Sequence, residues 1–356
     1  MPALLAALLL SGVLVACGSD DSGATSEDEA LVEEAREGVD VATVDSEAFL
    51  GDPNPEACGG GTYTIGADIF SSNEEFANAY VDGLETAAEA MGCVELKVLY
   101  NEVDPLQALA NAETLASQGV DAITNLQVLA AANPGIMRVY DDAEIPVIAG
   151  AVPAPGATFL GVPDYKSGLD GGRFLATTYQ ERVPDGPVPW LLIGEFPDGG
   201  QLSLDRLNGI VDGIKEIIPD IPDEQIIRID TKADPVNTLD RAKEQINTIP
   251  EDAQILASAI NDSTTYAIFQ ALDQAGRADT SHLMGIGGVN PGGLQFVCDN
   301  ESYVGTISHQ PETWGSYLIP AAVARILGKP IPPSIDVPWV INTRDNMKQN
   351  YPDAPC

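Results

Sequence analysis

The sequence predicts an α/β protein built from two lobes, each a doubly wound parallel sheet with helices on both faces. The chain has 356 residues, of which 44% are hydrophobic, so it is too long for one compact core and too apolar for a disordered chain. From Tyr63 onward, short apolar runs alternate with segments of helical spacing, which is typical of successive βα units. The alternation begins again near Val188 and indicates a second lobe.

In the first half, the first predicted strand is a short apolar run, and the first predicted helix carries apolar residues at helical spacing. Gly92 and Gly119 stand directly after the first two helices, where a C-cap glycine is common. The expected strands are residues 63–70, 94–100, 120–126 and 145–150, and the expected helices are residues 74–91, 105–118 and 136–142.

The second half repeats this order. Strands are expected at residues 188–194, 225–230 and 254–260, and helices at residues 204–218 and 236–248. Residues 104–112 also align with residues 234–242, and both begin with Asp-Pro after the second strand of their half. There the carboxylate can cap a helix and the proline suits its first turn. Two independent caps would explain this pair alone, but the matching strand order favours an internal duplication.

Two such lobes facing each other direct the carboxyl ends of both sheets toward one cleft, which is where ligands bind in open parallel sheets. The charge balance excludes nucleic acid as the ligand. Lys and Arg number 17 against 54 Asp and Glu, so the formal net charge is −37. Such a charge repels phosphate backbones and anionic headgroups at long range.

The N-terminus is predicted to be an export signal. Residues 3–16 form an almost unbroken apolar run that is too short to span a bilayer and suits the h-region of a signal peptide. Leu14-Val15-Ala16-Cys17 resembles the bacterial lipobox, in which the cysteine becomes the lipidated N-terminus; a chance cysteine is the alternative. We therefore expect a signal peptide at residues 1–17, lipidation at Cys17 and a flexible acidic tether at residues 18–61, with one short helical candidate at residues 30–36.

Four cysteines remain after Cys17, and an even number in an exported chain favours disulfides. Three connectivities are possible. Our preferred hypothesis pairs Cys58 with Cys93 and Cys298 with Cys356, because each pair would tie a terminal segment to a nearby helix end. The chain has no C-x-x-C spacing and only two histidines, so a structural zinc site is not expected.

The order of several short segments resembles that of the sugar-type periplasmic binding proteins that serve ABC importers, the ribose- and galactose-binding group. The resemblance covers nearly all of residues 63–346, and its order and spacing are more specific than any single segment. It rests on residues 65–76 (IGADIFSSNEEF), 104–105 (DP), 145–148 (IPVI), 203–209 (SLDRLNG), 259–262 (AIND), 284–288 (MGIGG) and 305–311 (GTISHQP).

This resemblance implies a type I periplasmic-binding-protein-like fold, with two lobes joined by a hinge. The N-terminal lobe would comprise residues 62–163 plus 310–339, and the C-terminal lobe residues 164–309 plus 340–356. The chain would cross between the lobes near residues 161–164, 309–311 and 339–342.

In the first lobe, the resemblance implies ligand contacts from Phe70, Asn73 and Phe76, aromatic and amide groups that stack on a pyranose ring and bond its hydroxyls. Phe76 also fits the apolar stripe of its helix and could be a core residue. Asn125 matches the family's ligand-facing asparagine at the end of the third strand, although an asparagine there can simply form a turn.

In the second lobe, Arg206 matches the arginine of the family's R-x-x-G element, whose guanidinium can hold adjacent hydroxyls or a carboxylate. A solvated helix arginine is the alternative. Asn261 matches the family's second-lobe asparagine. His309 stands where relatives have a glutamine beside the hinge, and it could either donate to the ligand or be an interlobe histidine with internal partners.

Two departures from the family concern the solute. Ala151-Val152 replace an Asp-Arg pair after the fourth strand, and Gly287-Gly288 replace an Asp near the hinge. Two carboxylates that accept sugar hydroxyl protons are therefore missing, and Asp68 and Asn290 are candidates to replace them. The remaining groups suit a sugar or cyclitol, and also a less hydroxylated or anionic solute.

The sequence therefore predicts a monomeric, extracytoplasmic, membrane-anchored lipoprotein that captures a small polar solute, foremost a sugar, and delivers it to an ABC permease. A ligand-sensing lipoprotein that signals to a membrane receptor is the alternative. An enzyme is disfavoured because the chain has no G-x-S-x-G elbow, no Walker A loop and no G-x-G-x-x-G at a helix start. No catalytic residue, cofactor, metal ion or nucleic acid is expected.

Overall fold

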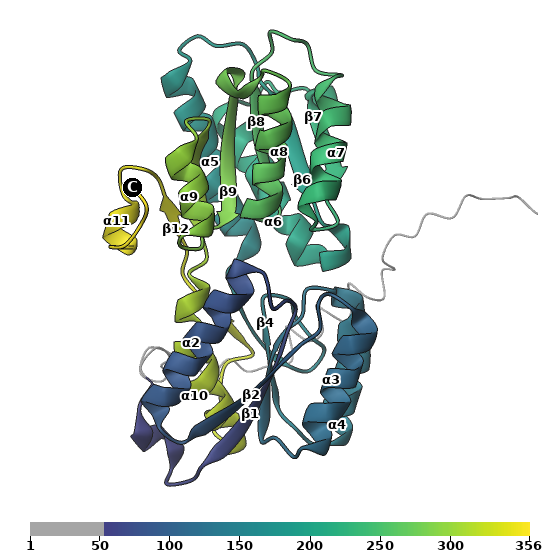
Figure 1. Cartoon of the computed structure of the whole chain (residues 1–356), viewed down its shortest axis with the longest axis vertical. Coiled ribbons are helices and arrows are strands. Elements are labelled where there is room, and N and C mark those ends of the chain that lie inside the picture. Colours follow the sequence, from purple (N-terminus) through teal and green to yellow (C-terminus); the bar gives the residue numbers. More distant parts are fainter. Residues whose placement is uncertain (1–52) are drawn as a thin grey trace, which may run out of the picture. The chain divides into compact units, whose positions relative to one another are not determined.

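The computed structural model of the protein describes residues 53–356 (Figure 1). The predicted signal peptide, the predicted lipidation site Cys17, the helical candidate at residues 30–36 and most of the predicted tether lie outside the described residues. Two six-stranded sheets, each covered by helices, form two lobes, which confirms the predicted fold class.

The first lobe contains a parallel sheet with the strand order β11-β5-β4-β3-β1-β2. One face is covered by α2 (Glu75–Met91) and α10 (Gly315–Ile326), and the other by α3 (Pro105–Ser117) and α4 (Asn133–Asp142). The strands are β1 (Tyr63–Ile69), β2 (Val94–Tyr100), β3 (Ala122–Leu126), β4 (Val147–Gly150), β5 (Thr158–Gly161) and β11 (Ser334–Asp336).

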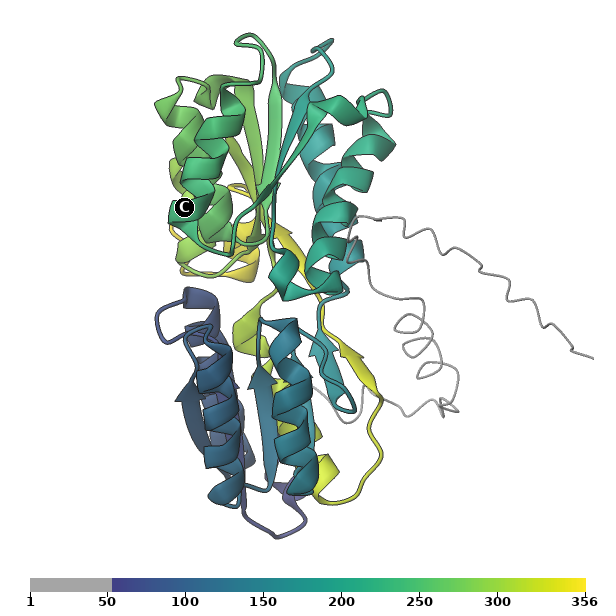
Figure 2. The ribbon, with the colours of Figure 1, turned by 90° about the vertical axis from the view of Figure 1, so that its right-hand side faces the viewer.

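The second lobe contains a sheet with the order β12-β10-β9-β8-β6-β7, in which only β12 is antiparallel to its neighbour. Helices α5 (Asp164–Arg182) and α6 (Gln201–Ile217) lie on one face and α7 (Pro235–Ile246), α8 (Asp262–Gln274) and α9 (Gly292–Asp299) on the other (Figure 2). The strands are β6 (Trp190–Glu195), β7 (Ile226–Asp230), β8 (Ile255–Ala259), β9 (Ser281–Gly287), β10 (Tyr303–Ser308) and β12 (Val340–Asn342).

The strand order of the two lobes agrees with an internal duplication. The order β2-β1-β3-β4-β5 in the first sheet equals the order β7-β6-β8-β9-β10 in the second. The chain passes between the sheets three times: between β5 and α5, between β10 and η7 (Pro311–Thr313), and between β11 and β12. The third passage occupies residues 337–339, earlier than expected, because β12 has already begun at Val340.

We predicted no strand or helix between residues 150 and 188, whereas the structure has β5 and α5 there. Helix α5 contains three glycines, which lower its helix propensity and interrupt its apolar stripe. The structure shows what these glycines do. A Cβ on Gly168 or Gly172 of α5 would overlap a backbone carbonyl of α6, and a Cβ on Gly209 or Gly213 of α6 would overlap a backbone carbonyl of α5. The two helices therefore pack backbone to backbone.

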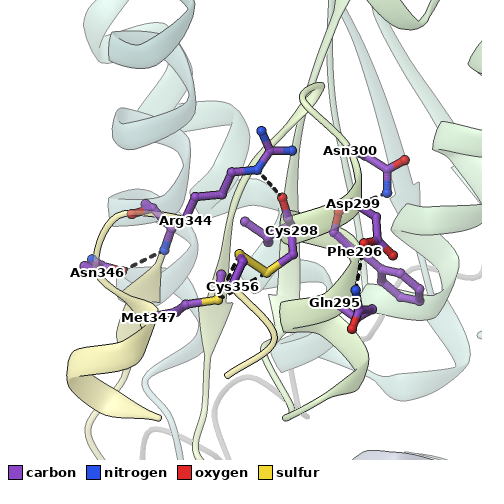
Figure 3. Close-up of a disulfide and its surroundings, with 11 residues drawn as sticks. Gln295, Phe296, Cys298, Asp299, Asn300, Arg344, Asn346, Met347 and Cys356 are labelled. Carbon is purple, nitrogen blue, oxygen red and sulfur yellow. Dashed lines mark hydrogen bonds between the residues drawn. A yellow bond between two sulfur atoms is a disulfide. The ribbon is translucent and has the colours of Figure 1, made fainter. Parts of the chain in front are cut away.

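Both disulfides of our preferred hypothesis are present. The bond between Cys58 and Cys93 ties the short helix η2 (Pro55–Cys58) to the turn after α2. Residues 55–61 are therefore held against the first lobe. The prediction that they form the end of the tether is wrong. The bond between Cys298 and Cys356 ties the C-terminus to α9, with Met347 beside it (Figure 3). Closing loops of 35 and 58 residues stabilises the fold by about 4 kcal/mol each in the chain-entropy model.

Candidate functional site

A cavity of about 600 Å³ lies at the carboxyl ends of both sheets. Residues that follow β1, β2 and β3 line it from the first lobe, and residues that follow β6, β7, β8 and β9 line it from the second. Parallel strands place such loops at one sheet edge, so the site lies where the fold class predicts it. Its volume is in the range of small-molecule sites.

The loops that precede α3 and α7 reach this cavity with the same backbone geometry. Glu102 and Val103 have φ angles of 51° and 58°, and Lys232 and Ala233 have φ angles of 54° and 52°. Non-glycine residues rarely adopt this left-handed conformation, so its repetition at matching positions is informative. After each pair follows the Asp-Pro, whose aspartate accepts hydrogen bonds from the first amides of the helix, as predicted. These loops agree with the duplication of the lobes.

Three predicted residues of the first lobe, Phe70, Asn73 and Phe76, line the cavity. Phe76 packs edge to face against Trp314, with ring centroids 5.6 Å apart, so it contributes to the cavity wall and also contacts the core of the lobe. Trp314 lines the cavity as well, and its Nε1 donates a hydrogen bond to the carbonyl of His309 at 2.7 Å. Sequence reasoning missed Trp314, which lies five residues beyond the matched histidine.

Asn125 does not line the cavity. It lies within β3 and is 1% exposed, and its Nδ2 is 3.4 Å from Oδ1 of Asn133 in α4. Successive side chains of a strand point to opposite faces of the sheet, so neighbouring residues such as Asn125 and Leu126 contact different surroundings. Here Leu126 and Val128 reach the cavity instead. The turn-former alternative is also wrong, because Asn125 is a buried strand residue.

Arg206 lines the cavity from α6, and it is not a solvated arginine. Its Nη2 lies 2.5 Å from Oδ1 of Asp164, its Nη1 donates to the carbonyl of Ile260 at 3.0 Å, and its side chain is only 17% exposed. Asp164 is the first residue of α5 and is 4% exposed. Burial raises the pKa of Asp164, while the charge of Arg206 opposes that shift. Because α5 follows the first passage between the lobes, this ion pair lies directly at that passage.

Asn261 lines the cavity and also caps α8. Its Oδ1 accepts hydrogen bonds from the backbone amide of Thr264 at 2.9 Å and from the hydroxyl of Thr264 at 2.7 Å. Because the cap occupies the oxygen, only the Nδ2 amide group remains for a ligand. A mutational test of Asn261 therefore has to distinguish the loss of the helix cap from the loss of a solute contact.

His309 lines the cavity, is 2% exposed and has an Nε2 with no hydrogen-bond partner among residues 53–356. Burial and the nearby charge of Arg206 hold the pKa of His309 well below its usual range, so the imidazole is neutral. Its backbone amide donates to the carbonyl of Gly287 at 3.1 Å. The histidine thus lies at a passage between the lobes and also at the cavity wall, and both alternatives for it remain predictions.

The proposed replacements for the missing carboxylates do not line the cavity. Asp68 is fully buried inside the first lobe, where its carboxylate accepts hydrogen bonds from Asn111 at 2.7 Å and Asn101 at 3.2 Å. Asn290 is also absent from the cavity wall, whereas the replaced positions Ala151, Val152 and Gly287 do line it. Neither Asp68 nor Asn290 therefore faces this cavity.

Sequence reasoning overlooked Asp262, a cavity carboxylate that directly follows Asn261. It is 8% exposed and accepts hydrogen bonds from the hydroxyl of Thr306 at 2.8 Å and the backbone amide of Gly288 at 2.5 Å. Burial, with a smaller contribution from Glu75, raises its pKa to about 7. Its neighbours Gly285, Gly287 and Gly293 leave room for this carboxylate, since a Cβ on Gly285 or Gly293 would overlap it.

The buried Asp68 predicts a pH dependence of stability. Burial raises its pKa to about 6, above the value of 3.8 for an exposed aspartate. The folded state therefore binds this proton more tightly than the unfolded chain, and the resulting stabilisation is present below about pH 4 and lost as the pH rises through 6. We expect the free energy of unfolding of the wild type, relative to Asp68→Asn, to fall by about 2 kcal/mol between pH 4 and pH 8. Urea titrations of both proteins measure it, and parallel curves would contradict the assignment.

Within the part of the chain that the structure describes, no cluster of three or more His, Cys, Asp or Glu side chains could hold a metal ion. None of the helices in residues 53–356 is both long and apolar enough to cross a bilayer.

Two α/β lobes, three passages between them and a cavity at the carboxyl ends of both sheets define the class of two-lobed solute-binding proteins. The chain belongs to the periplasmic binding protein family, because the family model described as Periplasmic binding protein domain matches residues 65–330. A comparison with curated protein sequences found no match.

Several solved structures share this fold. An ABC transporter periplasmic solute-binding protein from Actinobacillus succinogenes, solved with bound D-allose, is 18% identical, with a TM-score of 0.69 over 82% of this chain and 100% of the other. An ABC transporter solute-binding protein from Bacillus halodurans, solved with bound myo-inositol, is 21% identical, with a TM-score of 0.68 over 82% and 97%. The fructose-binding periplasmic domain of a hybrid two-component system is 19% identical, with a TM-score of 0.68 over 81% and 93%.

Proposed function

We propose that the protein is an extracytoplasmic lipoprotein that captures a small polar solute, foremost a sugar or cyclitol, and delivers it to an ABC permease. The observation that carries the proposal is the cavity between the carboxyl ends of both sheets, where Phe70, Phe76, Asn261 and His309 combine aromatic walls with hydrogen-bonding groups. The solved relatives with D-allose and myo-inositol support the same class of solute.

The lobes, residues 62–163 with 310–339 and residues 164–309 with 340–356, would close on the solute around the three passages of the chain. Closure would bury the solute, and the closed form would be the one that the permease recognises. Cleavage after residue 16 and lipidation of Cys17 would anchor the monomer to the outer face of the membrane, with the segment after Cys17 as its tether.

The test is a thermal-shift screen of the mature protein against pentoses, hexoses and cyclitols, because a solute at about 100 times its Kd adds roughly 2.7 kcal/mol. For the responding solute, small-angle scattering should show a smaller radius of gyration at saturation. A screen without any response, or a scattering profile unchanged by a solute that binds, would contradict capture by closure.

A pair of variants then locates the site at Asn261. Asn261→Asp keeps an oxygen that can cap α8 but removes the Nδ2 donor, whereas Asn261→Ala removes both. We expect both variants to lose at least tenfold in affinity, and only Asn261→Ala to lose about 1 kcal/mol of stability. Titration calorimetry and urea unfolding measure the two effects. Wild-type affinity in both variants would show that the side chain of Asn261 does not contact the solute.

A sensing function is the second candidate. It is favoured by the structural similarity to the fructose-binding domain of a two-component system. Both candidates use the same cavity, and they differ in whether the ligand-bound protein stimulates a permease ATPase or a receptor.

A further inference from the structure

The cavity wall carries far more negative than positive charge. Among residues 53–356, only two cationic side chains, Arg206 and Lys232, line it. Six carboxylates line it as well: Glu74, Glu75, Glu102, Asp164, Asp234 and Asp262. A concave site with this excess attracts cations and repels anions.

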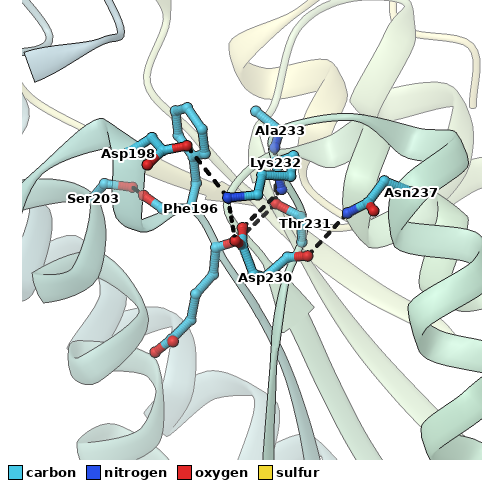
Figure 4. A network of polar contacts seen from close by, with 9 residues as sticks. Phe196, Asp198, Ser203, Asp230, Thr231, Lys232, Ala233 and Asn237 are labelled. Carbon is cyan, nitrogen blue, oxygen red and sulfur yellow. Dashed lines mark hydrogen bonds and ion pairs between the residues drawn. The ribbon is translucent and has the colours of Figure 1, made fainter. Parts of the chain in front are cut away.

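Neither cation is free to hold an anionic solute. Arg206 is paired with Asp164, and Lys232 lies 2.6 Å from Asp230 and 3.4 Å from Asp198 (Figure 4). The third basic group at the wall, His309, is neutral. An anionic solute, which the sequence analysis allowed as an alternative, would therefore enter a site with no uncompensated positive charge among the described residues.

Two of the carboxylates approach one dipeptide from opposite lobes. A Cβ on Gly292 would overlap Oε2 of Glu75, which comes from the first turn of α2, and a Cβ on Gly293 would overlap Oδ2 of Asp262, which comes from the first turn of α8. Neither carboxylate forms an ion pair within residues 53–356. Ionised Glu75 disfavours ionisation of Asp262, and a cation placed between the two carboxylates would offset this repulsion and favour the charged form of both.

The rest of the wall suits an organic cation better than a metal ion. Aromatic rings from both lobes line the cavity, and the face of an aromatic ring attracts ammonium groups. The buried Nε2 of His309 also has no partner within the described residues. The rings are Phe70, Phe76, Phe196, Phe296 and Trp314.

We propose that the solute carries a protonated amine beside its hydroxyl groups, as an amino sugar or an aminocyclitol does, and that Glu75 and Asp262 receive the ammonium from the two lobes. This rests on the proposed function, since it names the solute class of the same cavity. The ammonium replaces the absent counterion, and the hydroxyls meet the amide of Asn261 and the imidazole of His309.

The experiment uses matched probes that differ only in one amine. Titration calorimetry of the mature protein compares D-glucosamine with D-glucose, D-galactosamine with D-galactose, D-mannosamine with D-mannose, and scyllo-inosamine with scyllo-inositol. In each pair that binds, we expect the amine to bind at least tenfold more tightly, and its affinity to fall when the NaCl concentration rises from 50 to 500 mM, about the range over which charge screening becomes strong.

Three variants assign the effect. Glu75→Gln and Asp262→Asn should each reduce the ratio of amine affinity to neutral-partner affinity about tenfold, while Glu89→Gln, at the exposed far end of α2, should leave this ratio at its wild-type value. Glu75 is exposed, so its variant tests the proposal even if Asp262→Asn unfolds the protein. A neutral sugar that binds as tightly as its amine would overturn the inference and leave the proposed function intact. Binding of neither class would overturn both.

Discussion

Replacing Arg206 with Met is expected to lower the free energy of unfolding by about 3–5 kcal/mol, the usual cost of leaving one partner of a buried ion pair alone. The substitution leaves Asp164, only 4% exposed, without the guanidinium that lies 2.5 Å from its carboxylate. It also removes the hydrogen bond to the carbonyl of Ile260. Because Asp164 begins α5 directly after a passage between the lobes, the loss should loosen this passage as well as the helix.

The control is the double variant Arg206→Met/Asp164→Asn, which removes the buried charge together with its partner. We expect it to recover most of the lost stability, since deleting both members of a pair is far less costly than deleting one. Urea unfolding measures stability, and titration calorimetry measures solute affinity in the same proteins. If affinity returns together with stability, the Arg206–Asp164 pair acts through the fold; if stability alone returns, the pair contributes to the solute contact. An Arg206→Met protein as stable as the wild type would contradict the buried pair.

Replacing Gly172 with Ala is expected to destabilise the second lobe by about 3 kcal/mol, at the upper end of overpacking effects. The added Cβ would overlap the backbone carbonyl of Ile210. The helices cannot move apart at this point alone, because their backbones are equally close at Gly168, Gly209 and Gly213. A main-chain atom has no rotamer with which to avoid the contact, so α5 and α6 must separate along their length.

The matched control is the same substitution at Gly135 in α4, where nothing lies within 4 Å of the new Cβ. Gly135→Ala should be neutral or should stabilise the protein by up to about 1 kcal/mol, because alanine has the higher helix propensity. Thermal and urea unfolding of both variants provide the comparison. Equal effects of the two substitutions would show that the close packing of α5 on α6 is not required for stability.

Much of the fold could be predicted because its signals are local. Strand β2, in which charged Glu95 and Lys97 alternate with apolar residues, has the predicted bounds, and the Asp-Pro pairs at Asp104 and Asp234 carry their capping chemistry in two residues. Helix α5 could not be predicted in this way. Its glycines look like helix breakers in sequence, and they become favourable only through a partner helix that is distant along the chain.

The cavity shows the same division. Six of the seven predicted ligand-site residues line it, because they stand at strand ends or helix starts that the fold class directs to one edge. Asn125 does not, since one position of strand alternation turned its side chain toward α4. Asp262 was visible in the sequence but could not be distinguished from an ordinary helix-capping aspartate until Gly285, Gly287 and Gly293 were seen to surround it.

By itself, the sequence determined that the chain forms two α/β lobes with a cleft, that its cysteines after Cys17 are suited to disulfides and that its net charge is strongly negative. These properties follow from periodicity, composition and short-range capping, which depend on neighbouring residues. The tertiary structure alone decided how α5 packs on α6, that Arg206 is paired with Asp164, and that Glu75 and Asp262 approach neighbouring glycines at the cavity wall. Each of these depends on contacts between residues far apart in the chain, and burial then changes the energy of the charges involved.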